Sequence, residues 1–403
     1  MEHPHVRART WARIDLDRLR ANARAVGAQV GGVERILATV KADAYGHGAV
    51  EVARALVDEG VEWFGVATVA EGAELRDAGV VSRILVLSPT LSQQADAAVD
   101  AGLTLTVGSV ECLEALDACA IRRGTKVWVH LPVDTGMGRD GVLPDDVSGI
   151  VERARKMEGI ALEGISTHFP AADDLRRAFT LRQIRRMDHV LESVDPNRDL
   201  IRHMANSAGL LHFPDSVGDL VRPGLLLYGL FPAERNEGAL SVSPVLNFYS
   251  RVVHVKTLPE KHPVSYGRTW YTSRPTRIAT VAVGYADGFY RSLSGGRGCV
   301  LVGGARCPVR GAVTMDMTMV EVPADVDVTV GDEVVLVGTQ GAERITAWEM
   351  AARRGTIPWE VLTDIGPRVP RVYREGGKSR RARALLGTDR VRDPIVGGHG
   401  AED

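Results

Sequence analysis

Lys41 is the strongest candidate for chemistry in this 403-residue chain. It directly follows an apolar run, ILATV at 36–40, and this run predicts a buried strand. Burial lowers the pKa of an ammonium group and frees the amine as a nucleophile. Lys41 is therefore a candidate Schiff-base lysine, although a lone lysine that ends a strand is more often a surface residue whose charged end reaches water.

Other polar residues also follow apolar runs. They are Asp134, Arg139, Thr167, His168, Asn206, Ser207 and Arg222. A lysine, hydroxyls, glycines and arginines at one place are what a phosphate-bearing aldehyde cofactor requires, and pyridoxal phosphate is the obvious candidate. Gly224 could bring its backbone amide close to a phosphate, and Ser207 could donate a hydroxyl. Taken singly, His168 also fits a core histidine, and 134–141 also fits a plain glycine loop.

Short β-branched runs alternate with helix-like stretches between residues 36 and 222. The predicted strands are 36–40, 62–67, 83–88, 103–107, 126–131, 160–166, 200–204 and 218–221, and the main predicted helices are 49–59, 70–77, 110–123, 145–156 and 175–194. This alternation predicts an α/β fold with a (β/α)8 TIM-like barrel over 12–240, although a doubly wound open sheet shares the pattern. In both, reacting groups collect at the carboxyl ends of the strands.

Strand-like runs replace the helical pattern after residue 240. They are 250–257, 277–284, 299–303, 307–313, 318–322 and 332–338, with one helix expected near 346–354. Glycine-rich turns between them predict a mostly antiparallel β domain over 241–375. The alternating run Trp11–Asp15, within residues 1–15, is a candidate to pack with this domain. Residues 376–403 are expected to form a flexible tail.

The charge balance argues against several classes of partner. The chain has 49 basic and 51 acidic residues, so nothing favours nucleic acid or an anionic membrane surface. It has neither an N-terminal signal pattern nor an apolar run that could span a bilayer, and we expect a cytoplasmic protein with a small-molecule partner. Four scattered cysteines fit packing positions rather than disulfides or a metal site, and no metal is expected.

Nine motifs between residues 11 and 373 resemble those of the alanine racemases, a family of the fold-type III pyridoxal phosphate class. They are VKADAYGHG (40–48), VDTGMGRDG (133–141), STHFPAAD (166–173), MANSAG (204–209), VRPGLLLYG (221–229), VSYGRTW (264–270), VGYADGFYRSLS (283–294), MDMTMVEV (315–322) and RVPRVY (368–373). The resemblance implies a barrel joined to a β domain, pyridoxal 5′-phosphate as cofactor and interconversion of L- and D-alanine.

The resemblance also implies two catalytic bases. Lys41 would hold the cofactor covalently and act as one base, and Tyr266 from the neighbouring subunit would act as the other. The chain would then form a head-to-tail homodimer with shared active sites. A two-base scheme is chemically sensible, because inversion needs a proton removed from one face of a planar carbanion and delivered to the opposite face.

Further contacts follow from the resemblance. The implied cofactor-binding set is Lys41, Tyr45, Leu87, Arg139, His168, Asn206, Ser207, Arg222, Gly224 and Leu225, and the implied substrate-binding set is Arg139, Met315, Asp316 and Tyr285. Arg139 would meet the cofactor's phenolic oxygen, and Arg222, oriented by His168, would face the pyridine nitrogen. A guanidinium only donates, so that nitrogen would stay unprotonated and the ring would be a poorer electron sink. Reprotonation at the α-carbon would then be favoured.

Four positions depart from the family pattern. Pro132 replaces a lysine or another polar residue, Ala312 an arginine, Thr314 a cysteine, and Pro367 a residue that is tyrosine in some members. These changes fit ordinary drift with replacement contacts, or a site opening that admits a bulkier amino acid in a secondary pathway. A decarboxylase of the same fold type is disfavoured because no GGG run or cysteine motif is present, and a non-catalytic cofactor carrier because such carriers lack the β domain.

Overall fold

The computed structural model describes residues 8–383, which divide into two compact units. The barrel unit comprises Arg18–Ala44 and Ala49–Ser243, and the β unit comprises the chain up to Asp17, the short segment Tyr45–Gly48 and the chain from Pro244 onward. The domain boundary expected between residues 240 and 241 falls just before Pro244.

The barrel unit is built on seven parallel strands that pair in chain order. They are β2 (Leu37–Thr39), β3 (Trp63–Val66), β4 (Arg83–Val86), β5 (Thr104–Thr106), β6 (Val127–Pro132), β7 (Ile160–Ser166) and β8 (Ile201–His203). Each overlaps one of the predicted strands. All positions of β2, β3 and β5 are buried, as expected for strands covered on both faces.

The prediction of an eighth strand over 218–221 was wrong, because this segment forms only isolated β-bridges. Val221 bridges Ile36 at the start of β2, and Arg222 bridges Asn206 just after β8. The Leu37 N–H donates to the Val221 carbonyl at 2.8 Å. Pro223 has no N–H to continue the ladder, so the pairing is short. The bridges nevertheless link the two ends of the sheet, and the predicted barrel fold is confirmed.

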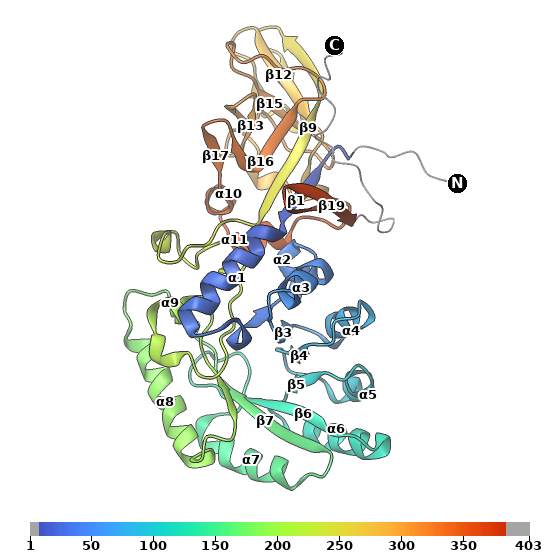
Figure 1. The fold of residues 1–403 in the computed structure, drawn as a ribbon. Coiled ribbons are helices and arrows are strands. Elements are labelled where there is room, and N and C mark those ends of the chain that lie inside the picture. Colours follow the sequence, from blue (N-terminus) through green and yellow to red (C-terminus); the bar gives the residue numbers. More distant parts are fainter. Residues whose placement is uncertain (1–7, 384–403) are drawn as a thin grey trace, which may run out of the picture. The chain divides into compact units, whose positions relative to one another are not determined.

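Helices connect these strands. They are α1 (Leu16–Val30), α2 (Lys41–Gly46), α3 (Ala49–Val57), α4 (Val69–Asp77), α5 (Ala95–Asp100), α6 (Val110–Arg123), α7 (Val147–Lys156), α8 (Ala178–Val194) and α9 (Ser207–His212). Figure 1 shows α3, α4, α5 and α6 following one another along the outer side of β3 to β6. Local signals set the ends of α6: the Ser109 hydroxyl accepts the Cys112 N–H at 3.2 Å, and Gly124 ends the helix at φ 62°. Helices α1, α2, α5 and α9 were not among the predicted helices.

Apolar side chains from β6, β7, α7 and α8 meet in one core cluster of the barrel unit. Leu131, Ile165, Val147 and Met187 are each at most 2% exposed within it. Burying one such side chain contributes about 1.5–3 kcal/mol relative to leaving it exposed. A smaller cluster of Leu37, Trp63, Leu85 and Leu220, with Leu87 packed against it, joins side chains from separate strands.

The β unit is mostly antiparallel, as predicted. Its strands are β1 (Trp11–Asp15), β9 (Leu246–Leu258), β10 (Pro263–Val264), β11 (Trp270–Tyr271), β12 (Thr276–Val281), β13 (Cys299–Val302), β14 (Ala305–Pro308), β15 (Thr318–Glu321), β16 (Glu333–Gln340), β17 (Glu343–Ile345), β18 (Arg371–Glu375) and β19 (Lys378–Arg383). The main path runs β14-β13-β16-β9-β1-β18-β19. β1 pairs antiparallel with β9 and parallel with β18. Two short helices complete the unit, α10 (Ala347–Arg354) and α11 (Pro358–Thr363).

The C-terminal hairpin corrects the expected start of the flexible tail. β19 pairs antiparallel with β18 through a turn at Gly376 and Gly377, so residues 378–383 belong to the sheet. Both glycines have positive φ, which suits a tight turn. Residues 384–403 lie outside the described part of the chain.

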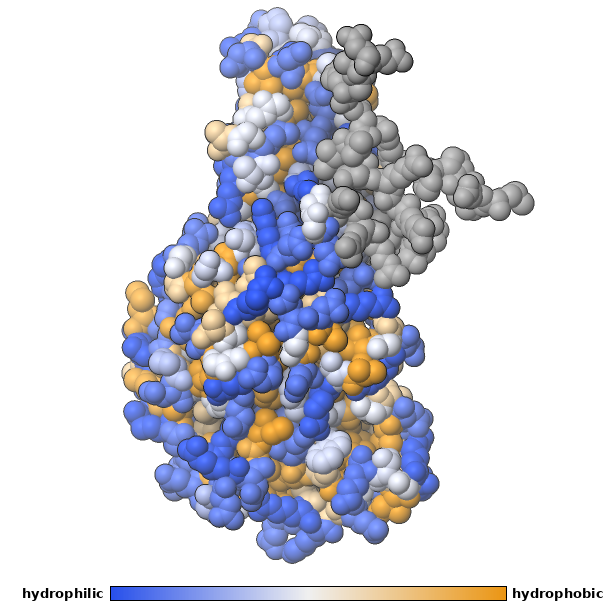
Figure 2. All heavy atoms as spheres, viewed as in Figure 1, coloured by the Kyte–Doolittle hydropathy of each residue, from blue (hydrophilic) through white to orange (hydrophobic). Residues whose placement is uncertain are grey.

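The described surface is mixed in polarity. Figure 2 shows hydrophobic side chains interspersed with hydrophilic ones over the visible face. Among residues 8–383, no helix has the length and apolar character needed to cross a membrane, and no cluster of three or more His, Cys, Asp or Glu side chains could hold a metal ion. All four cysteines are free and buried.

Candidate functional site

Lys41 lies just after β2, at the carboxyl end of the first barrel strand. Its side chain is partly buried. Burial lowers the pKa of its amine, and the positive charges of Arg139 and Arg222 lower it further, while the Glu71 and Asp140 carboxylates oppose this shift. The amine is therefore easier to deprotonate than an ordinary lysine, as nucleophilic attack or proton removal requires.

The residues after Lys41, which make up the rest of α2, form a left-handed turn. Residues 42–45 have φ between 52° and 55°, although none is glycine. Such a conformation costs roughly 1–2 kcal/mol per residue, so other contacts must fix it. The Ala44 N–H donates to the Val40 carbonyl at 2.8 Å, and the Asp43 carboxylate accepts the Ala49 N–H at 2.8 Å. This turn sets the direction in which the chain leaves Lys41.

Arg222 is buried among neutral hydrogen-bond acceptors. One terminal nitrogen donates to His203 Nδ1 and the His203 carbonyl, both at 2.6 Å. The other contacts the carbonyls of Thr167 at 2.6 Å and Met204 at 3.1 Å, and His168 Nδ1 at 3.3 Å. Burial and the charge of Arg139 lower the pKa of Arg222 to about 10, so it remains a cation near neutral pH. Within the described chain its Nε–H has no partner, so this donor is free for a ligand.

His168 lies beside Arg222, as expected. Burial, followed by the charges of Arg222, Arg139 and Lys41, lowers the pKa of His168 to about 3. Its imidazole is therefore neutral near pH 7, and its Nδ1 can accept the Arg222 N–H. The predicted orienting role of His168 is thus geometrically possible, but three carbonyls and His203 share it.

A buried chain of side chains extends from Arg222 through the barrel. His203 Nε2 lies 2.7 Å from His130 Nδ1, and His130 Nε2 faces Glu163 Oε2 at 3.5 Å. Glu163 also pairs with Arg83 at 2.5 Å. Because Arg222 only donates, His203 accepts through Nδ1 and carries its proton on Nε2, so His130 in turn points its Nε2–H at the carboxylate. Burial lowers the pKa of both imidazoles, so both are neutral near pH 7, and the donors point in order from Arg222 toward Glu163.

His130, His203 and Glu163 were not among the predicted site residues. All three stand inside predicted strands rather than after them: 126–131, 200–204 and 160–166. A polar residue that interrupts an apolar strand was the available signal, because a buried polar side chain needs a partner.

Ser207, Gly224 and Leu225 lie together near Arg222. The Ser207 hydroxyl oxygen accepts the Gly224 N–H at 3.0 Å, so its own hydrogen remains free to donate. Leu225 is 1% exposed, yet its N–H has no partner among the residues that the structure describes. Buried backbone donors are nearly always paired, so an orphan here suits an anionic ligand. Asn206 serves the local fold: its side chain accepts the Gly209 N–H at 2.9 Å and caps α9.

Arg139 lies on a loop that Asp134 organises. Burial opposes ionisation of Asp134, but N–H donors from Gly138, Gly136 and Met137 outweigh it and lower the pKa of this carboxyl. Arg139 is half exposed and lies 3.6 Å from Asp140. Asp140 is therefore a replacement partner, since Pro132, buried at the end of β6, has no donor to offer.

In the β unit, Tyr266 lies on a turn whose neighbours Ser265, Gly267 and Arg268 have positive φ. The Ser265 hydroxyl donates to the Ala312 carbonyl at 2.6 Å and fixes the start of this turn. The Tyr266 side chain is 73% exposed, which is unusual for a large aromatic residue. Its ring is therefore available to a second molecule.

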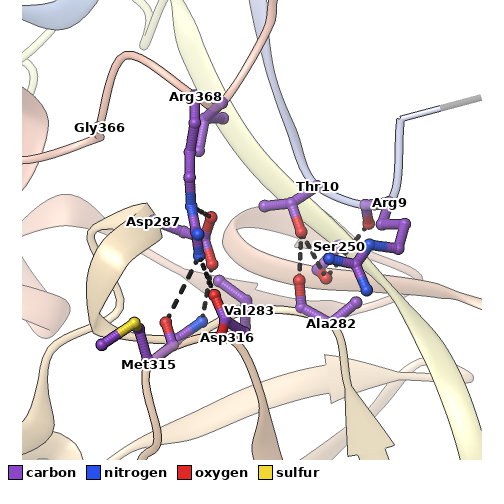
Figure 3. Close-up of polar contacts among 12 residues, drawn as sticks. Arg9, Thr10, Ser250, Ala282, Val283, Asp287, Met315, Asp316, Gly366 and Arg368 are labelled. Atoms are coloured by element: carbon purple, nitrogen blue, oxygen red, sulfur yellow. Dashed lines mark hydrogen bonds and ion pairs between the residues drawn. The ribbon is translucent and has the colours of Figure 1, made fainter.

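Arg368 holds the loop that contains Met315 and Asp316 (Figure 3). It donates to Asp287 Oδ1 at 2.7 Å, to Asp316 Oδ1 at 2.8 Å and to the Met315 carbonyl at 3.4 Å. A Cβ on Gly284 would lie 2.3 Å from that carbonyl, so only glycine fits there. The Met315 N–H has no hydrogen-bond partner in the described range and can bind an anion.

Of the predicted site residues, the barrel unit brings Lys41, Arg139, His168 and Arg222 within electrostatic reach of one another. Ser207, Gly224 and Leu225 lie close to Arg222 in the barrel unit. Leu87 packs against the cluster of Leu37, Trp63, Leu85 and Leu220, where the missing side chain of Gly65 leaves room for it. The other predicted residues belong to the β unit: Tyr45, Tyr266, Tyr285, Met315 and Asp316. Burial raises the pKa of Tyr45 to about 12, so its hydroxyl stays protonated.

A barrel with a lysine of lowered pKa, a buried arginine and unpaired backbone donors at its strand ends, joined to a mostly antiparallel β unit, is the architecture of a two-domain barrel enzyme. The chain belongs to the alanine racemase family, a family of isomerases: residues 14–232 match the alanine racemase N-terminal domain and residues 245–373 the alanine racemase C-terminal domain.

Relatives and solved structures agree with this assignment. The alanine racemase of Symbiobacterium thermophilum is 44% identical over 372 residues, which cover 92% of this chain and 98% of the relative. The solved alanine racemase of Clostridium difficile 630 has a TM-score of 0.89 at 37% identity, over 94% of this chain and 100% of that one. The structure from Bartonella henselae, described as having covalently bound pyridoxal phosphate, has a TM-score of 0.82 at 28% identity, over 91% and 100%.

Proposed function

We propose that this protein interconverts L- and D-alanine with pyridoxal 5′-phosphate as cofactor. The observation that carries the proposal is the activated Lys41 amine at a barrel strand end, beside the cations Arg139 and Arg222. Relatives that cover most of the chain are named alanine racemase, and one solved relative is described with covalently bound pyridoxal phosphate. These names support the same reaction here.

The free donors at the strand ends fit this cofactor. Lys41 would hold its aldehyde carbon, the Ser207 hydroxyl and the orphaned Leu225 N–H would hold its phosphate, and the free Arg222 Nε–H would face its ring nitrogen. Gly224 would contribute less than predicted, because its N–H already donates to Ser207. When bound, the cofactor withdraws electrons from the amino acid and acidifies its α-proton.

Arg222 fits the predicted electronic role. It cannot accept a proton, and its terminal nitrogens are fixed by neutral partners, so it can offer only a hydrogen bond to the ring nitrogen. The neutral His203 and His168 cannot supply a proton to that nitrogen either. We infer that this limits electron withdrawal by the ring and favours return of the proton to the α-carbon.

We infer a two-base reaction in a head-to-tail homodimer. Lys41 would move the proton on one face of the substrate, and the exposed Tyr266 of a second copy would move it on the other. The free Met315 N–H, also of the second copy, would bind the substrate carboxylate together with Arg139, and Tyr285 and Asp316 would lie near the site opening. A cytoplasmic location is part of the same proposal.

Proton NMR in deuterated water tests the function directly. With cofactor and L-alanine, we expect loss of the α-proton signal and formation of D-alanine. Exchange confined to a bulkier amino acid would show that alanine is not the substrate. It would then indicate that the changed site opening, at Pro132, Ala312, Thr314 and Pro367, admits the larger side chain. Loss of carbon dioxide would instead support a decarboxylase, and absence of any exchange would support a carrier.

Replacing Ser207 with alanine should weaken cofactor binding. One hydrogen bond to a charged group contributes about 1.5–3 kcal/mol, so the Kd should rise about tenfold to a hundredfold. The fluorescence of the bound cofactor measures this. Ser216→Ala removes another buried hydroxyl, one that donates to the Phe213 carbonyl at 2.7 Å, and serves as the control. Equal affinity of the Ser207 variant and wild type would remove Ser207 from the phosphate site.

A further inference from the structure

Glu71 takes part in an N-terminal capping box of α4. Its N–H donates to the Thr68 hydroxyl at 3.2 Å, and its carboxylate oxygen Oε2 accepts the Ala67 N–H at 2.6 Å and the Thr68 N–H at 3.3 Å. Such reciprocal bonds satisfy N–H groups that a helix leaves unpaired at its start. This role needs only one of the two carboxylate oxygens.

The second oxygen of Glu71 contacts the chain beside Lys41. Oε1 accepts the Ala42 N–H at 2.9 Å. Ala42 directly follows Lys41 and is the first residue of the left-handed turn. One carboxylate therefore joins the chain after β2 to the chain after β3, and it accepts N–H donors on both sides. A glutamine could accept on only one side, because its amide nitrogen would face a second donor.

The charge of Glu71 also reaches the Lys41 amine. Among the groups that shift its pKa, two carboxylates, Glu71 and Asp140, oppose burial and the cations Arg139 and Arg222. His168 also lies nearby and is neutral near pH 7. Removing the negative charge of Glu71 while leaving the cations should therefore favour the neutral amine.

We propose that Glu71 is a positioning residue for Lys41: it anchors the strained turn that follows the lysine and supplies a negative charge beside its amine. The inference rests on the proposed function in one respect, that Lys41 is the amine that holds the cofactor. It assigns to this carboxylate a role beyond capping α4.

Glu71→Gln and Thr68→Ala separate the two roles. Both variants damage the capping box, and losing the Thr68 cap costs about 1 kcal/mol. Only Glu71→Gln also changes the charge beside Lys41 and the bonding of Ala42. The first readout uses cofactor-free protein: a small acylating reagent is added near neutral pH, and modification of Lys41 is followed by peptide mass spectrometry. The second is the Kd for pyridoxal 5′-phosphate, and thermal unfolding checks that both variants fold.

We expect Lys41 of Glu71→Gln to react about threefold faster than in wild type, because the neutral amine is more populated. Cofactor binding should weaken about tenfold, because the turn loses an anchor. Thr68→Ala should match wild type in both. If the two variants behave alike, Glu71 only caps α4 and the proposal is overturned. Failure of the cofactor to protect Lys41 in wild type would instead count against the proposed function.

Discussion

Lys41→Ala should abolish racemisation, with kcat at least about four orders of magnitude lower. General acid–base catalysis alone contributes about 10²–10⁴-fold, and this variant also loses the amine that would hold the cofactor covalently. Proton NMR in deuterated water should show no α-proton exchange for either enantiomer of alanine. The visible absorption of the protein with cofactor should also lose the band that depends on the lysine.

Lys156→Ala is the matched control for this variant. Lys156 is exposed on α7 and pairs with Glu152 at 2.6 Å, so its loss should leave kcat unchanged. Adding a small primary amine to Lys41→Ala should restore part of the exchange, because the variant is still folded and has lost only the amine of the base. Substantial activity of Lys41→Ala without added amine would overturn the assignment of Lys41.

The strand-end residues could be predicted because their positions follow from the sequence pattern. Lys41, His168, Ser207 and Arg222 each follow an apolar run, and a parallel barrel brings the ends of such runs together. The eighth strand was overestimated, since Pro223 limits pairing to a bridge. Helix α1 was missed because frequent arginines and small residues weaken the apolar stripe of LDRLRANARAVGAQV.

Contacts between residues far apart in the chain could not be predicted from the sequence pattern. The left-handed turn after Lys41 uses residues that ordinarily favour right-handed backbone, and contacts such as Ala42 with Glu71 hold it. The order His203, His130, Glu163 becomes visible only when β6, β7 and β8 lie side by side. In both cases the partner is far along the chain, so neither residue type nor local spacing indicates it.

Tyr266→Phe should separate proton exchange from inversion. The variant keeps the ring but loses the hydroxyl, so racemisation should fall about 10²–10⁴-fold. Lys41 should still exchange the α-proton of one enantiomer with deuterium much faster than that enantiomer inverts, while the other enantiomer should stay protonated. Tyr271→Phe, half exposed on the neighbouring β11, is the control and should behave like wild type. Full inversion by Tyr266→Phe would exclude this hydroxyl as the second base.

Mixing the two inactive variants tests whether a second copy supplies Tyr266. In a dimer of Lys41→Ala with Tyr266→Phe, one shared site would carry both changes and the other neither. After equal amounts are dissociated and reassembled, half of the dimers should be mixed, so about a quarter of wild-type activity should return. If each site instead used Lys41 and Tyr266 of one chain, no site in any dimer would be intact and no activity would return. That result would place both bases within one subunit, whereas recovery would require that the reacting carbon lie between two chains.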